Sequence, residues 1–186
     1  MDKRPIGVFD SGVGGLTVLR EIADRLPVED LIYFGDTKRF PYGIKSLEDV
    51  RKFVFKIYDF LVKKNVKLIV IACNTASAAA LENLKAVSTI PVIGVVEPGA
   101  RAALFKTSKK RIGVIATETT VKSKAYNSAI CKLDNTISVF SRSASHLVDY
   151  IEKGITEGED LTKTIKSCIT PLTKQNIDVL ILGCTH

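Results

Sequence analysis

Short apolar, β-branched runs alternate with amphipathic helical segments along almost the whole chain, and this alternation restricts the possible folds most. Strands that alternate with helices of this length form βαβ units, whose strands pair in parallel. The runs are apolar almost throughout, as expected when helices cover both faces of a sheet. We therefore predict an α/β fold with largely parallel sheets flanked by helices. The expected strands are 5–9, 31–34, 68–72, 92–96, 112–116, 137–140 and 179–182, and the expected helices are 15–26, 46–64, 75–86, 97–106, 119–132, 144–153 and 160–175.

The expected strands fall into two groups, separated by the segment "EPGARAALFKTSKKR" at 97–111. This segment is typical of a helix followed by a charged turn. We predict two similar lobes, 1–96 and 97–186, with an active-site cleft between them. The sequences "IGVF" and "IGVI" begin the two groups, which favours an internal duplication.

The net charge of +7 raises the question of a nucleic-acid partner. Lysine and arginine are spread over many segments, and no arginine-rich tract or aromatic–basic interleaving occurs. The longest apolar runs fall far short of a membrane span, and the one near the N-terminus is too short for a signal peptide. We therefore expect a cytoplasmic protein with no nucleic-acid or membrane partner, whose charge favours an anionic small substrate.

The four cysteines, at positions 73, 131, 168 and 184, are not expected to form disulfides in the cytoplasm. They contain no C-x-x-C pair, and the chain has two histidines, so we predict no metal site. Cys131 and Cys168 fall in predicted helices, where a free cysteine usually behaves as a small buried apolar residue. Cys73 and Cys184 differ, because each directly follows a predicted strand.

Ligands of open parallel sheets bind at the loops that follow the carboxyl ends of the strands. The relevant loops are "DSGVGG" (10–15), "GDTKRFPYG" (35–43), "CNTAS" (73–77) and "CTH" (184–186). The first resembles a dinucleotide loop, with Asp36 as the ribose ligand, but Thr17 stands where the third glycine belongs. This departure makes a dinucleotide enzyme the less favoured alternative. A glycine loop before a helix N-terminus suits a carboxylate as well as a phosphate.

Two cysteines that follow strands, one in each predicted lobe, could transfer protons to and from a substrate. A thiol at a helix N-terminus, as predicted for Cys73, has a pKa lowered toward neutrality. Two thiols on opposite sides of a substrate can remove a proton from one face and deliver a proton to the other. Hydroxyl and amide donors stabilise the negative charge that develops on a carboxylate when its α-proton leaves. Such donors are Ser11, Asn74, Thr75 and Thr185.

Five motifs in order resemble the cofactor-independent glutamate racemases of the Asp/Glu racemase family. They are "IGVFDSGVGGLTVLREI", "YFGDTKRFPYG", "IACNTASAAAL", "PVIGVVEPGA" and "LILGCTH". The form "CNTASA" favours the glutamate branch over the aspartate racemases. The resemblance implies an isomerase that interconverts L- and D-glutamate without a cofactor and supplies D-glutamate for peptidoglycan and cell-wall synthesis.

The resemblance also implies a role for individual residues. Cys73 and Cys184 match the two catalytic acid/bases, and Asp10 and His186 match the residues that assist the first and the second thiol. Glu152 matches a further acidic helper near the second cysteine. The implied glutamate-binding pairs are Asp10 with Ser11, Tyr42 with Gly43, Asn74 with Thr75, and Thr185 with His186.

The chain departs from the family pattern in two places. The stretch "SASHLVDYIEKG" has neither the cysteine nor the prolines of the family, and His146 and Asp149 replace apolar or proline positions. We expect His146 to be a surface residue. Family members continue past the final histidine with strands and a helix that return to the first lobe, a part that this chain is expected to lack.

Two alternatives to glutamate racemisation follow from these departures. One is a racemase of aspartate or another small amino acid. The other is a non-catalytic protein that binds a dicarboxylate. The sequence leaves open whether the chain forms a homodimer.

Overall fold

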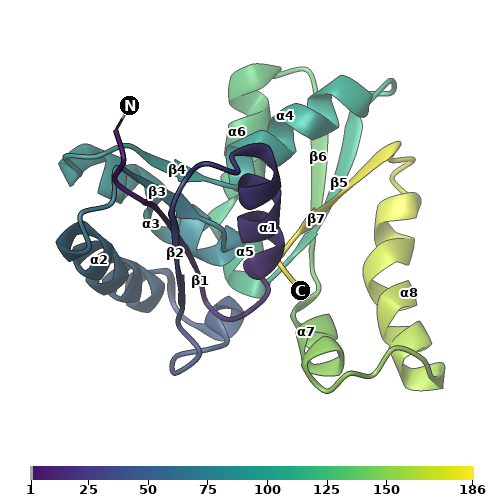
Figure 1. Cartoon of the computed structure of the whole chain (residues 1–186). Coiled ribbons are helices and arrows are strands. Elements are labelled where there is room, and N and C mark those ends of the chain that lie inside the picture. Colours follow the sequence, from purple (N-terminus) through teal and green to yellow (C-terminus); the bar gives the residue numbers. More distant parts are fainter. Residues whose placement is uncertain (1) are drawn as a thin grey trace. The chain divides into compact units, whose positions relative to one another are not determined.

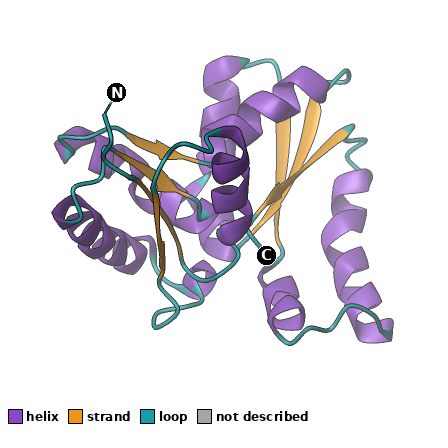
Figure 2. Ribbon diagram, in the orientation of Figure 1, coloured by secondary structure: helices purple, strands orange, loops and turns teal. Residues whose placement is uncertain are grey.

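The computed structural model describes residues 2–186, which form two α/β units (Figure 1). The first unit runs to Val95 and includes Thr185, and the second runs from Val96 to Cys184 and includes His186. Each unit has its own parallel sheet with helices packed on it (Figure 2). The predicted α/β class with parallel sheets is confirmed.

The first unit holds a four-stranded parallel sheet in the order β2-β1-β3-β4. The strands end in register, since Asp10 pairs with Gly35 and Phe9 pairs with Ile71. The loops that follow β1, β2 and β3 therefore leave the sheet at one edge. The elements are β1 (Ile6–Asp10), α1 (Leu16–Arg25), β2 (Leu31–Gly35), η1 (Tyr42–Ile44), α2 (Leu47–Lys63), β3 (Leu68–Ile71), α3 (Asn74–Val87) and β4 (Val92–Gly94).

Alternate side chains of these strands face different helices, as the pleat of a strand requires. Phe9 and Ile71 belong to the core under α2 and α3. Val8 and Val70 belong to a second core, against which the apolar face of α1 packs. The helices thus cover both faces of the sheet, which explains why its strands are apolar throughout.

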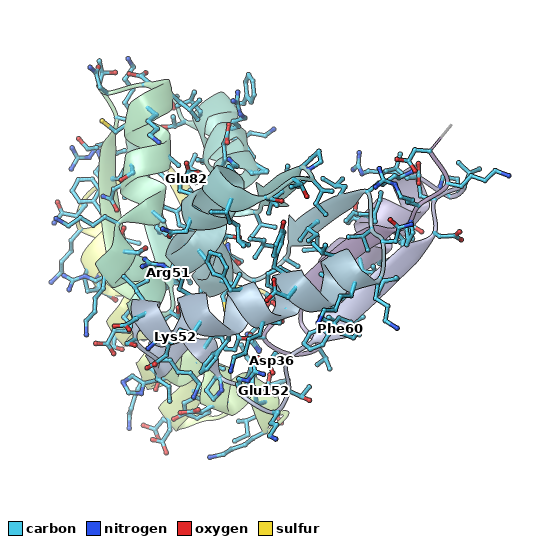
Figure 3. The ribbon with its side chains drawn as sticks, turned by 90° about the vertical axis from the view of Figure 1, so that its left-hand side faces the viewer. Asp36, Arg51, Lys52, Phe60, Glu82 and Glu152 are labelled. Carbon is cyan, nitrogen blue, oxygen red and sulfur yellow. The ribbon has the colours of Figure 1, made fainter. Side chains whose placement is uncertain are left out.

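Helix α2 shows how the sequence sets this packing. Its buried residues are Val50, Val54, Ile57 and Leu61, which share one helical face. The helix begins at the Ser46 cap, whose hydroxyl accepts the backbone N–H of Asp49 at 3.1 Å. Arg51 lies on α2 (Figure 3). Its Nε donates to the Ala79 carbonyl on α3 at 3.1 Å.

The second unit holds a three-stranded parallel sheet in the order β6-β5-β7. One core of this unit contains apolar side chains of α4, β5 and α6, among them Ala100, Ile112 and Ile130. The elements are α4 (Val96–Lys106), β5 (Arg111–Ala116), α5 (Glu118–Ser123), α6 (Ala125–Leu133), β6 (Ser138–Ser143), α7 (Ser145–Glu152), α8 (Glu159–Thr173) and β7 (Val179–Gly183).

The two sheets share an arrangement in which the first strand of each unit lies between the second and the third. The repeated "IGV" triplet occupies these inner strands, and its glycine is closely covered in both. A Cβ on Gly7 would lie 3.2 Å from a methyl of Leu61, and a Cβ on Gly113 would lie 2.5 Å from the Cδ1 of Ile177. The similar lobes are therefore built on the same strand order and the same close packing.

The prediction of one helix over 119–132 is wrong, because the chain turns between α5 and α6. Lys124 has a φ of 56°, a left-handed conformation that ends α5. The Ser123 hydroxyl donates to the Thr120 carbonyl at 2.6 Å and accepts the N–H of Ala125 at 3.2 Å. These bonds compete with the regular helical pattern and stabilise the break.

One expectation for the helical cysteines is confirmed and one is wrong. Cys168 is buried, whereas Cys131 is exposed. The buried face of α6 contains Tyr126 and Ile130. Cys131 follows Ile130 directly, and successive residues of a helix point about 100° apart, so its thiol faces away from the core.

We predict that Leu61→Ala lowers the free energy of unfolding by about 2–5 kcal/mol, because it leaves a cavity beside β1. The neighbouring Val62→Ala, at a side chain that is 38% exposed, is the matched control and should cost less than about 0.5 kcal/mol. Urea denaturation followed by circular dichroism measures both. Equal losses for the two variants would contradict the packing described for α2.

Candidate active site

The carboxylate of Asp10, at the end of β1, is completely buried. Its Oδ2 accepts the backbone N–H of Gly12 at 2.9 Å, and its Oδ1 accepts the Thr185 hydroxyl at 3.3 Å. The Tyr33 hydroxyl donates to the Gly12 carbonyl at 2.7 Å. The loop after β1 is therefore held in place by hydrogen bonds from two other segments of the unit.

Cys73 caps the N-terminus of α3, as predicted. Its Sγ accepts the backbone N–H of Ala76 at 3.4 Å and lies 3.8 Å from the Ser11 hydroxyl. The thiol donates to the Ser11 oxygen, while the positive end of the helix dipole favours negative charge at the sulfur. Asn74 and Thr75 begin the same helix, and both side chains are buried.

The pKa of the Tyr33 phenol is also affected by its surroundings at this end of the sheet. Burial, followed by the negative charges of Asp10 and Cys73, raises the pKa of Tyr33 well above its ordinary value. The hydroxyl therefore stays protonated and keeps donating to the Gly12 carbonyl.

The loop after β2 is organised by the buried carboxylate of Asp36. This group accepts the Tyr42 hydroxyl and, at 3.0 Å, Nη1 of Arg39. Burial and the hydrogen bond to Asp36 raise the pKa of Tyr42. Tyr42 and Gly43 form the buried part of η1, and Asp36 holds the first of these two predicted glutamate-binding residues. Because its carboxylate binds Tyr42 and Arg39, it is poorly placed to bind a ribose.

The glycines of the first loop are explained by packing inside the unit. A Cβ on Gly15 would lie 2.5 Å from the Cβ of Asp10 and 2.9 Å from the Tyr33 hydroxyl. A Cβ on Gly14 would lie 2.8 Å from the Thr185 hydroxyl. Both glycines are needed for close approach of neighbouring side chains, so the motif does not require a dinucleotide.

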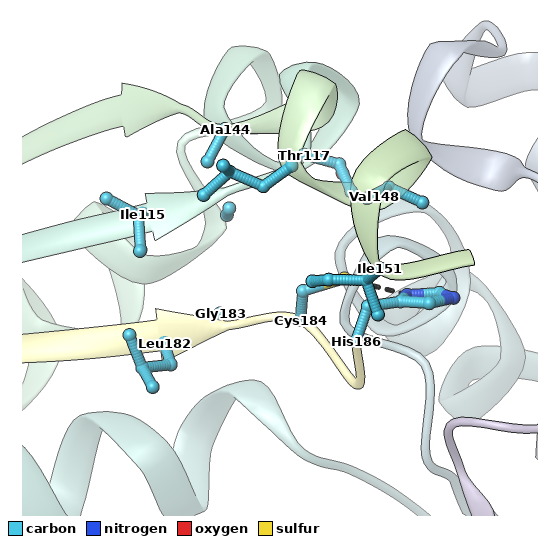
Figure 4. Close-up of a pocket in the computed structure, with 11 residues that line it drawn as sticks. Ile115, Thr117, Ala144, Val148, Ile151, Leu182, Gly183, Cys184 and His186 are labelled. Carbon is cyan, nitrogen blue, oxygen red and sulfur yellow. Dashed lines mark hydrogen bonds between the residues drawn. The ribbon is translucent and has the colours of Figure 1, made fainter. Parts of the chain in front are cut away.

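In the second unit, Cys184 directly follows β7 and lies beside His186 (Figure 4). The Cys184 Sγ and the His186 Nδ1 are 3.3 Å apart. On the other side of the ring, the His186 Nε2 lies 3.0 Å from Oε1 of Glu152, the last residue of α7. The imidazole is 8% exposed and the carboxylate is 40% exposed. This thiol–imidazole–carboxylate series suits proton transfer to and from sulfur.

A pocket of about 210 Å³ adjoins this series. Its walls are mainly apolar, and low polarity strengthens electrostatic interactions between the polar groups that it contains. Figure 4 shows the lining residues, which are Ile115, Ala116, Thr117, Ala144, Leu147, Val148, Ile151, Leu182, Gly183, Cys184 and His186.

The comparison with known proteins decides the family. The family model for Asp/Glu/hydantoin racemases matches residues 6–186. The chain belongs to this family.

Within this family, the relatives that are about half identical to the chain are glutamate racemases, which confirms the resemblance drawn from the sequence motifs. The chain is 50% identical to the glutamate racemase of Geobacter metallireducens, covering 100% of this chain and 69% of that relative. It is 48% identical to that of Oceanobacillus iheyensis, covering 100% and 68%.

Solved structures of glutamate racemases have the same fold as this chain. The glutamate racemase isoform RacE1 of Bacillus anthracis superimposes with a TM-score of 0.95 at 47% identity, covering 100% of this chain and 70% of that one. The Francisella tularensis glutamate racemase, solved in complex with D-glutamate, gives a TM-score of 0.93 at 42% identity with the same coverage.

Most of the predicted site residues of this racemase gather within their own unit. Asp10 and Ser11, Tyr42 and Gly43, and Cys73 with Asn74 and Thr75 follow three strands at one sheet edge, and Thr185 reaches Asp10. Cys184, His186 and Glu152 form the series in the second unit. His146 is exposed, as expected, and neither His146 nor Asp149 lines the Cys184 pocket.

The sequence analysis missed Thr117 and Thr120. Thr117 caps α5 and lines the Cys184 pocket, and its hydroxyl lies 2.9 Å from that of Thr120, with both side chains buried. The duplicated strand contains the signal that could have found them. "ATETT" follows "IGVI" in β5 as "DSG" follows "IGVF" in β1, so Thr117 corresponds to Ser11.

Across residues 2–186, the His, Cys, Asp and Glu side chains form no group of three that could hold a metal ion. In the same described part of the chain, every helix is too short or too polar to cross a lipid bilayer.

We predict that Tyr33 does not contribute to the tyrosine titration of the folded protein near pH 10, because its raised pKa keeps it protonated. Tyr33→Phe should leave the rise in tyrosinate absorbance unchanged up to about pH 11. In concentrated guanidinium the same variant should lose one fifth of the rise, since the chain has five tyrosines. A smaller rise for the folded variant than for the folded wild type over the same pH range would contradict the site geometry.

We also predict that His186→Gln slows alkylation of Cys184 by iodoacetamide about tenfold, the effect of losing about 1.4 kcal/mol of thiolate stabilisation. Mass spectrometry resolves the rate at each cysteine. The exposed Cys131 serves as the control inside the same molecule, and its rate should not change. An unchanged ratio of the two rates would show that His186 does not activate this thiol.

Proposed function

We propose that this chain interconverts L- and D-glutamate by proton transfer between two cysteines, without a cofactor. The observation that carries the proposal is that each unit has one cysteine at the end of a strand, and each cysteine has its own set of proton-handling neighbours. Cys73 has a helix N-terminus and Ser11, and Cys184 has His186 and Glu152. Glutamate is the substrate named for relatives up to 50% identical.

The reaction needs one base and one acid at the α-carbon. One cysteine, as thiolate, takes the α-proton, and the electron pair of the broken C–H bond is delocalised into the substrate carboxylate. The other cysteine, as thiol, donates its proton to the opposite face of the same carbon. The configuration is inverted, and the two sulfurs have exchanged protonation states, so the enzyme is ready for the reverse direction.

The α-proton of an amino acid is weakly acidic, so the developing charge must be stabilised. The proposed donors are the side chains of Ser11, Asn74, Thr75 and Thr185, together with backbone groups of Tyr42 and Gly43. Preorganised donors of this kind contribute without needing a metal ion. Asp10 is buried and hydrogen-bonded to Thr185, which supports its proposed roles in assisting the first thiol and in positioning the substrate.

The biological role follows from the product. We place the reaction in the cytoplasm, where D-glutamate would be supplied for peptidoglycan synthesis. Homodimer formation is a separate prediction, which analytical ultracentrifugation of the chain tests directly.

We predict that Cys73→Ser and Cys184→Ser each reduce glutamate racemisation at least about 100-fold, the contribution of one general acid/base. Chiral chromatography of reactions started from L- or D-glutamate measures the rates. Cys131→Ser, at an exposed thiol outside the site, should keep the wild-type rate.

The same assay separates the alternatives. Faster turnover of aspartate than of glutamate would assign a different substrate. A wild-type chain that racemises neither, although glutamate raises its melting temperature, would be a binding protein. Wild-type activity in either Cys73→Ser or Cys184→Ser would overturn the two-cysteine mechanism.

A further inference from the structure

A second pocket of about 440 Å³ lies in the second unit, between α7 and α8. These helices contact each other and lie side by side (Figure 1). The pocket shares no lining residue with the Cys184 pocket. It is therefore a separate feature that the proposed racemase reaction does not use.

The two pockets lie on different faces of α7. Residues Leu147, Val148 and Ile151 line the apolar pocket beside Cys184. His146, Asp149, Tyr150 and Lys153 line the second pocket, at the spacing i, i+3, i+4 and i+7 that places side chains on one helical face.

This polar face contains the departure from the family pattern in "SASHLVDYIEKG". His146 and Asp149 are the residues that replace apolar or proline positions, and both line the second pocket. The substitutions therefore leave the Cys184 pocket apolar and supply a charged or polar wall facing α8.

The polar groups of the pocket divide into donors and acceptors. The Lys153 ammonium and the His146 imidazole can donate to an anion. On α8, the Thr164 hydroxyl donates to the Asp160 carbonyl at 2.9 Å, and the Ser167 hydroxyl donates to the Thr164 carbonyl at 2.7 Å. Both hydroxyl protons are thus used within the helix, and these oxygens offer lone pairs to a ligand.

The opposite requirements of these groups define the ligand. Lys153 and His146 can bind an anionic group of a ligand. Thr164, Ser167 and the Asp149 carboxylate can accept hydrogen bonds from its hydroxyl or amine groups. The volume falls within the usual range of small-molecule sites and exceeds that of a phosphate ion. Ile155 and the ring of Tyr150 provide apolar contact for a carbon skeleton.

We propose that the pocket between α7 and α8 binds a sugar phosphate. Its phosphate contacts Lys153 and His146, and its hydroxyls donate to Asp149, Thr164 and Ser167. A bound ligand contacts the helix that carries Glu152, so this site lies one helix away from the His186 imidazole.

Isothermal titration calorimetry of the full chain with glucose 6-phosphate tests the proposal. We expect binding of one molecule per chain, with glucose and inorganic phosphate each at least tenfold weaker. Lys153→Gln and His146→Gln should each weaken binding of glucose 6-phosphate about tenfold, the loss of one charge-assisted hydrogen bond. The matched control is Lys166→Gln, at an exposed lysine of α8 outside the pocket, which should bind as the wild type does.

The outcomes separate this site from the catalytic proposal. Cys184→Ser should bind glucose 6-phosphate unchanged, because the two pockets share no residue. Absence of heat, equal weakening by Lys166→Gln, or inorganic phosphate binding as tightly as glucose 6-phosphate would each overturn the proposal. None of these results depends on racemase activity.

Discussion

Parallel pairing of strands is the constraint on which each unit of this racemase depends. All strands of a parallel sheet end at one edge, so segments that are distant in sequence deliver their following residues to the same place. In the first unit, the pairing of Asp10 with Gly35 and of Phe9 with Ile71 brings the loops of Asp10, Asp36 and Cys73 to that edge. In the second unit, Ala116 pairs with Gly183, so Thr117 and Cys184 leave neighbouring strands together.

The duplicated strand order supports two thiols in different surroundings. The Cys73 sulfur accepts the backbone N–H of Ala76 at the start of α3, whereas the Cys184 sulfur lies beside the His186 imidazole. A racemase must run equally well in both directions, since the two enantiomers have equal free energy. Each proposed acid/base must therefore work in both protonation states, and the neighbours of the two sulfurs differ between the units.

Much of this organisation could be predicted from the sequence, because the signals are local. The apolar runs before Cys73 and Cys184 predict strands, and the loops after them follow from the fold class. The break at Lys124 could not be predicted from helical periodicity, because it depends on the particular hydrogen bonds of the Ser123 hydroxyl. The contact between Glu152 and His186 depends on where the end of α7 lies relative to the segment after β7, so only the family resemblance pointed to it. That His146 and Asp149 line a pocket depends on the position of α8, which no local sequence pattern indicates.

The central claim is that two different groups, one on each side of the α-carbon, handle the proton. Racemisation of L-glutamate in D2O, stopped early and analysed by mass spectrometry after separation of the enantiomers, tests it most directly. The account predicts that the new D-glutamate carries deuterium at the α-carbon while the remaining L-glutamate keeps its original proton. D-glutamate that retains the substrate proton, or deuterium that enters both enantiomers equally from the start, would show that a single base serves both faces.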